Sequence, residues 1–161
     1  MSLRGKIDFA ELTDTGQVRE HNEDAIGTIP DIGLMVLADG MGGYSAGEVA
    51  SGIAVQIVTD LASEAADREE LHLIDAHSGL MRPSIILRDA IYRSNKIIYQ
   101  TAQSQTHCEG MGTTIVACMF YVNKVSIAHV GDSRAYRMRG GKLEQMHRAS
   151  AWRFLYPPNA F

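Results

Sequence analysis

The sequence predicts an α+β fold built on an antiparallel sheet, because of the order in which its strand-like and helical segments follow one another. Strand-like runs come first along the chain, two helical segments follow, and a further series of strand-like runs closes it. A doubly wound parallel sheet would instead alternate strands with helices. The length of 161 residues and the 45% hydrophobic content are typical of one domain with a sizeable core.

Three strand candidates precede the first helix. Ile7–Leu12 is a short mixed run, and the polar segment 13–24 follows it. Ala25–Ile29 is the second candidate, and Pro30-Asp31 is the turn signal after it. Gly33–Ala38 is almost wholly apolar and too short for a helix, which favours a buried strand.

Two amphipathic helices are expected next. Ser45 and Glu48 fit a capping box, from which the first helix runs to about Ala66. Its expected apolar stripe consists of Val49, Ile53, Ile57 and Leu61. Residues 67–82 are polar and irregular, which indicates a loop, and Pro83 suits the first turn of the second helix. The apolar side of that helix carries Leu87, Ile91, Ser94 and Ile98.

The last elements form a series of strands. Thr113–Val122 is rich in β-branched and aromatic residues, and Val125–Val130 returns after a short turn. Arg134–Met138 and Lys142–Met146 then flank a glycine pair, which is typical of a hairpin.

Composition and charge exclude several classes of protein. Fifteen basic against nineteen acidic residues give a net charge of −4, so no nucleic-acid partner is expected. No apolar run approaches the roughly 18 residues of a membrane span, and the N-terminus lacks a secretory signal. We therefore expect a cytoplasmic domain without a membrane partner. Cys108 and Cys118 lack the spacing of a zinc site and are expected to be plain thiols.

Two acidic clusters are the candidates for chemistry. Glu23 and Asp24 follow Arg19, and Asp39 ends the apolar strand immediately before Gly40. A carboxylate in such a place is costly to bury unless it is paired or binds a cation. Hard cations such as magnesium or manganese prefer carboxylate, carbonyl and water oxygens, and an arginine fork suits a phosphate. The spacing alone leaves a surface turn and a helix cap as the alternative.

Four motifs taken together are more specific. They are residues 13–24 (TDTGQVREHNED), 36–43 (VLADGMGG), 112–114 (GTT) and 130–136 (VGDSRAY). In this order they resemble the signatures of the metal-dependent protein phosphatases of type 2C, in their bacterial form, over about residues 5–146. The resemblance implies an antiparallel β-sandwich flanked by helices.

The resemblance also implies roles for individual residues. Asp39 matches the carboxylate that bridges two magnesium or manganese ions, and the Gly40 carbonyl matches a ligand of one of them. Glu23 matches a carboxylate on the metal–water cluster, and Asp24 matches its neighbour in the second shell. Arg19 matches the arginine that holds the substrate phosphate. A metal-activated water would then hydrolyse phosphoserine and phosphothreonine in phosphorylated proteins without a phosphoenzyme.

The chain departs from this family after the hairpin. The later Asp-His-Ser, Ser-Asp-Gly and Asp-Asn motifs are missing, and Glu144 is the only acidic residue after Asp132. We therefore interpret residues 1–146 as the N-terminal portion of a phosphatase-like domain, with the sandwich incomplete at the C-terminus. Asp132 is expected to have a structural role in its turn. Residues 147–161 form an atypical aromatic tail, which either packs on the core or reflects a truncated or frame-shifted chain.

Two expectations follow from this departure. Metal binding should be weak or absent, because too few ligands remain for two ions. The incomplete sheet should be covered by the tail, by a second copy in a homodimer or by a partner protein. The sequence leaves open whether the chain is an enzyme, and the alternative is a non-catalytic, phosphatase-like binding or regulatory module.

Overall fold

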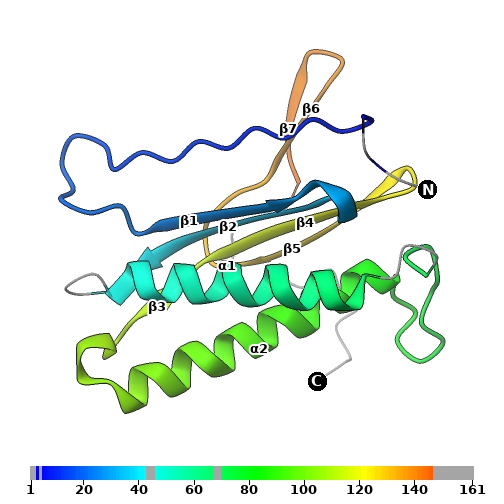
Figure 1. Ribbon diagram of the computed structural model, residues 1–161. Helices are drawn as coiled ribbons and strands as arrows, with labels where there is room; N and C mark the ends of the chain where they lie inside the picture. The colour runs from blue at the N-terminus through cyan, green and yellow to red at the C-terminus, as the bar shows by residue number, and fades with distance from the viewer. Residues whose placement is uncertain (1–2, 4, 43–45, 67–69, 147–161) are drawn as a thin grey trace.

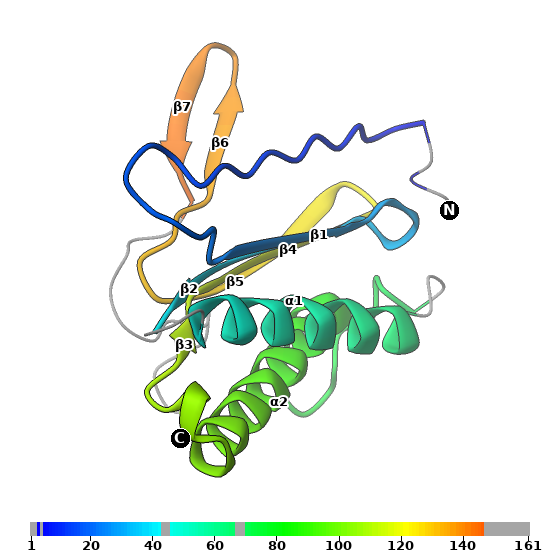
Figure 2. The ribbon, with the colours of Figure 1, turned by 60° about the vertical axis from the view of Figure 1, so that its left-hand side comes forward.

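The computed structural model describes residue 3 and residues 5–42, 46–66 and 70–146, and it has the predicted α+β architecture. A five-stranded antiparallel sheet carries two long helices on one face (Figure 1, Figure 2). The order of elements along the chain is also the predicted one: strands, two helices, then strands.

The main sheet has the strand order β1-β2-β4-β5. These strands are β1 (Asp24–Ile29), β2 (Leu34–Met41), β4 (Ile115–Tyr121) and β5 (Lys124–Val130). The short strand β3 (Gly112–Thr113) pairs only with the end of β2. A separate hairpin of β6 (Tyr136–Arg139) and β7 (Lys142–Gln145) stands on the side of the sheet away from the helices (Figure 1, Figure 2).

Helix α1 (Ala46–Ala65) approaches the sheet through small residues, which corrects the expected apolar stripe. Its most buried stripe consists of Ala46, Ala50, Ala54, Val58 and Ala62. Val49, which the periodicity placed in the stripe, is 38% exposed. Small side chains bring the helix close to β1, where a Cβ on Gly27 would lie 2.7 Å from Val55 Cγ1. The Ser45 half of the expected capping box lies outside the described residues.

Helix α2 (Arg82–Ser104) confirms the predicted apolar face. Leu87, Ile91, Ser94 and Ile98 are all buried, and Pro83 stands in the first turn. The Ser84 and Ser126 hydroxyls are 2.8 Å apart and join this helix to β5. None of the described helices combines the length and the apolar character that a membrane crossing requires.

The prediction of a strand at Ile7–Leu12 is wrong. This segment is extended and runs over the face of the sheet away from the helices, but it pairs with no described strand (Figure 1, Figure 2). A hydrogen bond from Thr28 to the Glu11 carboxylate connects it to β1. A short mixed run of this kind suits a strand, but a strand also needs a neighbour with which to pair.

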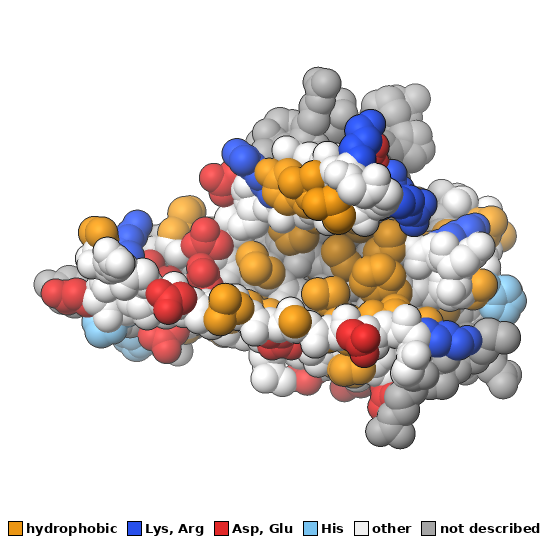
Figure 3. Space-filling model, turned by 90° about the horizontal axis from the view of Figure 1, so that it is seen from above, with side chains coloured by type: hydrophobic (Ala, Val, Ile, Leu, Met, Phe, Trp, Pro, Cys, Tyr) orange, Lys and Arg blue, Asp and Glu red, His pale blue; other side chains and the backbone are white. Residues whose placement is uncertain are grey.

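The two faces of the sheet differ in how they are covered. The face toward the helices is buried through Leu34, Val36 and Ala117. On the opposite face, which we call the outer face, Leu37 and Val125 are 38% and 36% exposed. Figure 3 shows hydrophobic side chains gathered in a hollow on this side of the molecule. The described chain thus has one sheet with two helices on one face, and only the extended segment before β1 and a two-stranded hairpin lie beyond the outer face.

Candidate active site

The sheet brings two of the predicted carboxylates together. In the register of β1 with β2, Asp24 is the direct partner of Asp39. Directly opposite residues in an antiparallel pair have side chains on the same face, about 4.5–5.5 Å apart at Cβ. Both residues are exposed. Two acidic side chains from distant motifs therefore stand side by side on the outer face, at one end of the sheet.

A small hollow collects all five predicted site residues. It has a volume of about 140 Å³, and Arg19, Glu23, Asp24, Asp39 and Gly40 line it. The other residues at its wall are Asp14, Thr15, His21 and Asn22, so the lining is mainly polar. The hollow therefore joins an acidic cluster with one exposed arginine.

Local hydrogen bonds shape the polar segment that carries Arg19. The Asp14 carboxylate accepts a bond of 2.7 Å from the Gly16 N–H, at a turn where Gly16 has a φ of +75°. The Asn22 amide donates to the Thr13 hydroxyl at 2.8 Å and accepts from the Asp24 N–H at 3.0 Å. Asx-type bonds of this kind explain why the segment is a loop that leads into β1.

The charges around Asp39 favour a cation. The pKa of Asp39 is raised, first by partial burial and then by the neighbouring carboxylate of Asp24 and by Asp132, while Arg19 opposes the shift. Desolvation and like charges both disfavour the ionised carboxyl. A bound cation would relieve this repulsion between the two carboxylates.

Glu23 lies beside the first turn of α1. A Cβ on Gly47 would approach the Glu23 Cδ to 2.8 Å, so this carboxylate packs against the helix. The Glu23 carbonyl accepts hydrogen bonds from the Gly40 N–H at 3.0 Å and from the Ser51 hydroxyl at 2.6 Å. Glu23 therefore joins the start of β1, the end of β2 and α1, and its negative charge lies at the favourable end of the helix dipole.

Gly40 is required by a close backbone contact. A Cβ at this position would lie 2.1 Å from the Gly47 carbonyl oxygen and 2.6 Å from that of Glu23. The family resemblance matched the Gly40 carbonyl to a ligand of a metal ion. The structure adds a packing reason, because only glycine lets β2 end so close to α1.

Thr114 and Ser133 lie near Asp39, although the sequence did not indicate them as site residues. The Thr114 N–H donates to the Asp39 carbonyl at 2.9 Å, and the Asp39 N–H donates to the Thr114 hydroxyl at 3.1 Å. The Thr114 and Ser133 hydroxyls are 2.6 Å apart. Both residues belong to the third and fourth sequence motifs, which were the only signals that pointed to them.

The residues that line the hollow include several oxygen donors. Their carboxylate and carbonyl oxygens have the chemistry that magnesium and manganese prefer. Within residues 5–42, 46–66 and 70–146, however, no group of three or more His, Cys, Asp or Glu side chains is close enough together to hold a metal ion. The donor chemistry fits a divalent cation, but the number of described ligands is small.

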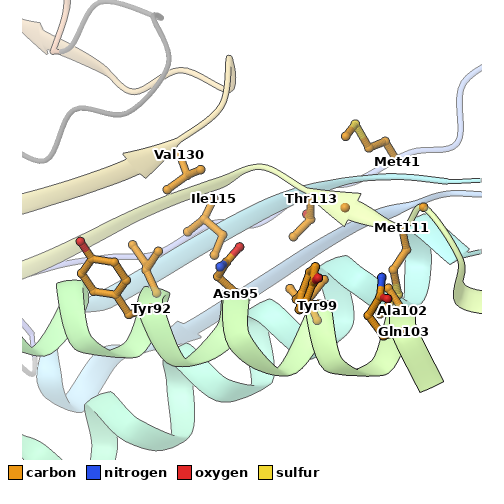
Figure 4. Close-up of a pocket in the computed structure, with 14 residues that line it drawn as sticks. Met41, Tyr92, Asn95, Tyr99, Ala102, Gln103, Met111, Thr113, Ile115 and Val130 are labelled. Atoms are coloured by element: carbon orange, nitrogen blue, oxygen red, sulfur yellow. The ribbon is translucent and has the colours of Figure 1, made fainter. Parts of the chain in front are cut away.

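A separate apolar pocket lies between α2 and the strands. Its volume is about 520 Å³, and Tyr92, Asn95 and Tyr99 point toward it from the helix (Figure 4). Ile115 and Val130 line its strand side. No charged side chain is among the residues that line this pocket, so it offers no cationic side chain to a phosphate.

Comparisons with known proteins agree on one family. A family model described as protein phosphatase 2C matches residues 15–151. The serine/threonine protein phosphatase PstP of Mycobacterium tuberculosis is 35% identical over 138 residues, which are 86% of this chain and 24% of that protein. The serine/threonine phosphatase stp of Listeria monocytogenes is 39% identical over 137 residues, which are 83% of this chain and 51% of that protein.

Solved structures show the same similarity. A structure of the PstP catalytic domain in complex with two manganese ions matches with a TM-score of 0.69 and 34% identity, over 84% of this chain and 53% of that one. Serine/threonine phosphatase Stp1 from Staphylococcus aureus matches with a TM-score of 0.68 and 40% identity, over 84% and 51%. The chain thus spans a quarter to about half of the length of these curated relatives.

Proposed function

The chain belongs to the protein phosphatase 2C family, and from this premise we propose that its acidic hollow serves the metal-dependent hydrolysis of phosphoserine and phosphothreonine in proteins. One observation carries the proposal: Asp24 and Asp39 are register partners, and Arg19 lines the same hollow. Carboxylates for cations beside an arginine for an anion are what phosphoester hydrolysis with metal ions needs.

Each of the five predicted site residues has a role in this proposal. Asp39, the Gly40 carbonyl and Glu23 would hold magnesium or manganese, and Asp24 would stand beside them. Bound metal would lower the pKa of a coordinated water and neutralise charge on the phosphoryl group. Arg19 would orient the phosphate, because its planar fork matches two phosphoryl oxygens. Its exposed position suits a phosphate presented on a protein surface.

The partial ligand set favours a second candidate function. No described group of three acidic, histidine or cysteine side chains comes together, so the isolated chain is expected to bind metal weakly. A non-catalytic, phosphatase-like module that recognises phosphorylated proteins through Arg19 is the alternative. The two functions differ in turnover, which only the first requires.

Hydrolysis of a small aryl phosphate with manganese tests the enzyme proposal. Wild type is compared with Asp39→Asn and with the control Asp60→Asn, whose carboxylate lies on α1 and accepts a bond from Gln56. Turnover in wild type and the control that disappears in Asp39→Asn supports the enzyme. Turnover that is equally low in all three proteins contradicts it, and binding of a phosphothreonine peptide then tests the second candidate.

A further inference from the structure

The pairing of β2 changes partner at Asp39. Leu37 pairs with Val116 of β4, and Gly40 pairs with Thr113 of β3. Thr114 lies between these two strands, belongs to neither, and faces Asp39 across the interruption. Asp39, which lines the acidic hollow, therefore lies where the regular backbone ladder is broken.

A side chain replaces the missing ladder bond. In a regular antiparallel pair, hydrogen-bonded partners exchange two backbone bonds. Here the Thr114 N–H donates to the Asp39 carbonyl at 2.9 Å, but the Asp39 N–H donates to the Thr114 hydroxyl at 3.1 Å. The Thr114 carbonyl accepts a bond of 3.0 Å from the Thr113 hydroxyl instead. The backbone of Asp39 is thus held by the Thr114 side chain.

The same side chain contacts the turn at 131–133. The Thr114 hydroxyl lies 2.6 Å from the Ser133 hydroxyl. Gly131 has a φ of +93°, and a Cβ on it would lie 2.7 Å from the Thr114 methyl carbon. Thr114 therefore uses its hydroxyl and its methyl group to join Asp39 to this turn.

We propose that Thr114 is a positioning residue, which fixes the Asp39 backbone against the turn at 131–133 so that the Asp39 carboxylate keeps a constant place beside Asp24. The inference rests on the proposed function in one respect, namely that Asp39 binds the metal. The hydroxyl is the essential group, since it alone supplies the bond to the Asp39 N–H.

The test compares three substitutions of similar size. Thr114→Val removes the hydroxyl and keeps the shape, whereas Thr114→Ser keeps the hydroxyl. Thr59→Val is the control, because the Thr59 hydroxyl bonds only to carbonyls within α1, at 2.9 Å from Val55 O and Gln56 O. Two quantities are measured: the amide hydrogen exchange rate of Asp39 by NMR, and the dissociation constant for manganese from the paramagnetic signal of the free ion.

The expected result depends on whether residue 114 carries a hydroxyl group. Thr114→Val speeds Asp39 amide exchange roughly tenfold, the effect of losing one hydrogen bond, and weakens manganese binding about 10–100-fold. Thr114→Ser restores both values to near wild type, and Thr59→Val changes neither. Wild-type exchange at Asp39 in Thr114→Val, or unchanged manganese affinity, overturns the inference. A wild-type chain without manganese affinity counts against the proposed function, and the exchange rates of Asp39 then decide the role of Thr114 alone.

Discussion

The Asp39 carboxylate is unfavourable for the stability of the fold at neutral pH, and it is also the proposed metal ligand. Its pKa is raised by partial burial and by the nearby carboxylates of Asp24 and Asp132. The Asp24 carboxylate therefore disfavours the ionisation of Asp39 while no cation is bound. Residues that bind or react are often less favourable for stability than their replacements.

The raised pKa predicts that Asp39→Asn stabilises the metal-free chain at neutral pH. A carboxyl whose pKa is raised by folding favours the folded state when it is protonated. Its stabilising effect is complete below the ordinary value of 3.8 and is lost as the pH rises through the raised value. The variant should therefore unfold at higher urea than wild type near pH 7, and the two midpoints should converge below 3.8. A difference that is independent of pH, or that Asp60→Asn reproduces, contradicts this account.

The two cysteine thiols are expected to be unreactive in the folded protein. Burial raises the pKa of the Cys118 thiol to about 11, and Cys108 is fully buried. Since the thiolate is the reactive form, both thiols should react slowly with a disulfide reagent in the native protein. Each reaction releases one thiol from the reagent, and the absorbance of that thiol should show two reactive groups only after denaturation. Fast reaction of either thiol at neutral pH would contradict the burial of these side chains.

At the scale of elements, two glycines of α1 have opposite expected effects. A Cβ on Gly47 would lie 2.8 Å from the Met41 nitrogen and from the Glu23 carboxylate, whereas one on Gly52 meets nothing within 4 Å. Gly47→Ala should therefore destabilise the chain by about 1–3 kcal/mol through overpacking. Gly52→Ala should stabilise it by roughly 0.5–1 kcal/mol through helix propensity. Urea unfolding measures both, and equal effects would contradict the close contact between α1 and β2.

Local patterns predicted most elements because their causes are local. Helix α2 follows from its apolar periodicity and Pro83, and the hairpin β6–β7 follows from the glycine pair between its strands. The strand at Ile7–Leu12 failed because pairing depends on a neighbour far away in the sequence. The buried stripe of α1 was misplaced for a related reason, since the closeness of the sheet favours alanine over larger apolar residues.

The site was predictable as a set of residues but not as an arrangement. The motifs singled out Arg19, Asp24 and Asp39, whereas the register that makes Asp24 the partner of Asp39 needed the folded sheet. Thr114 was missed as a functional residue because its role depends on a bond between a side chain and a backbone 75 positions away. Such long-range bonds leave no periodic signal in a sequence.

At the scale of the whole molecule, the outer face of the sheet is the most unusual feature. Leu37 and Val125 are 38% and 36% exposed on this face, and Leu37 pairs with the less exposed Val116. Soluble monomers rarely expose a contiguous apolar patch larger than a few hundred Å². The chain also spans only about half of the solved structures that it resembles. We therefore expect the exposed apolar side chains of this face to take part in contacts with another polypeptide.

The outer face predicts that the isolated chain associates with itself. Sedimentation over a range of protein concentrations should show reversible association of wild type. At low protein concentration, wild type should also bind a hydrophobic dye. Leu37→Lys places a charge on the outer face and should reduce both, because charged side chains block contact between apolar sheet surfaces. Val49→Lys is the matched control, since Val49 is also 38% exposed but lies on α1, on the other side of the sheet. A wild-type monomer that binds no dye, or equal effects of the two substitutions, would contradict a role of this face in association.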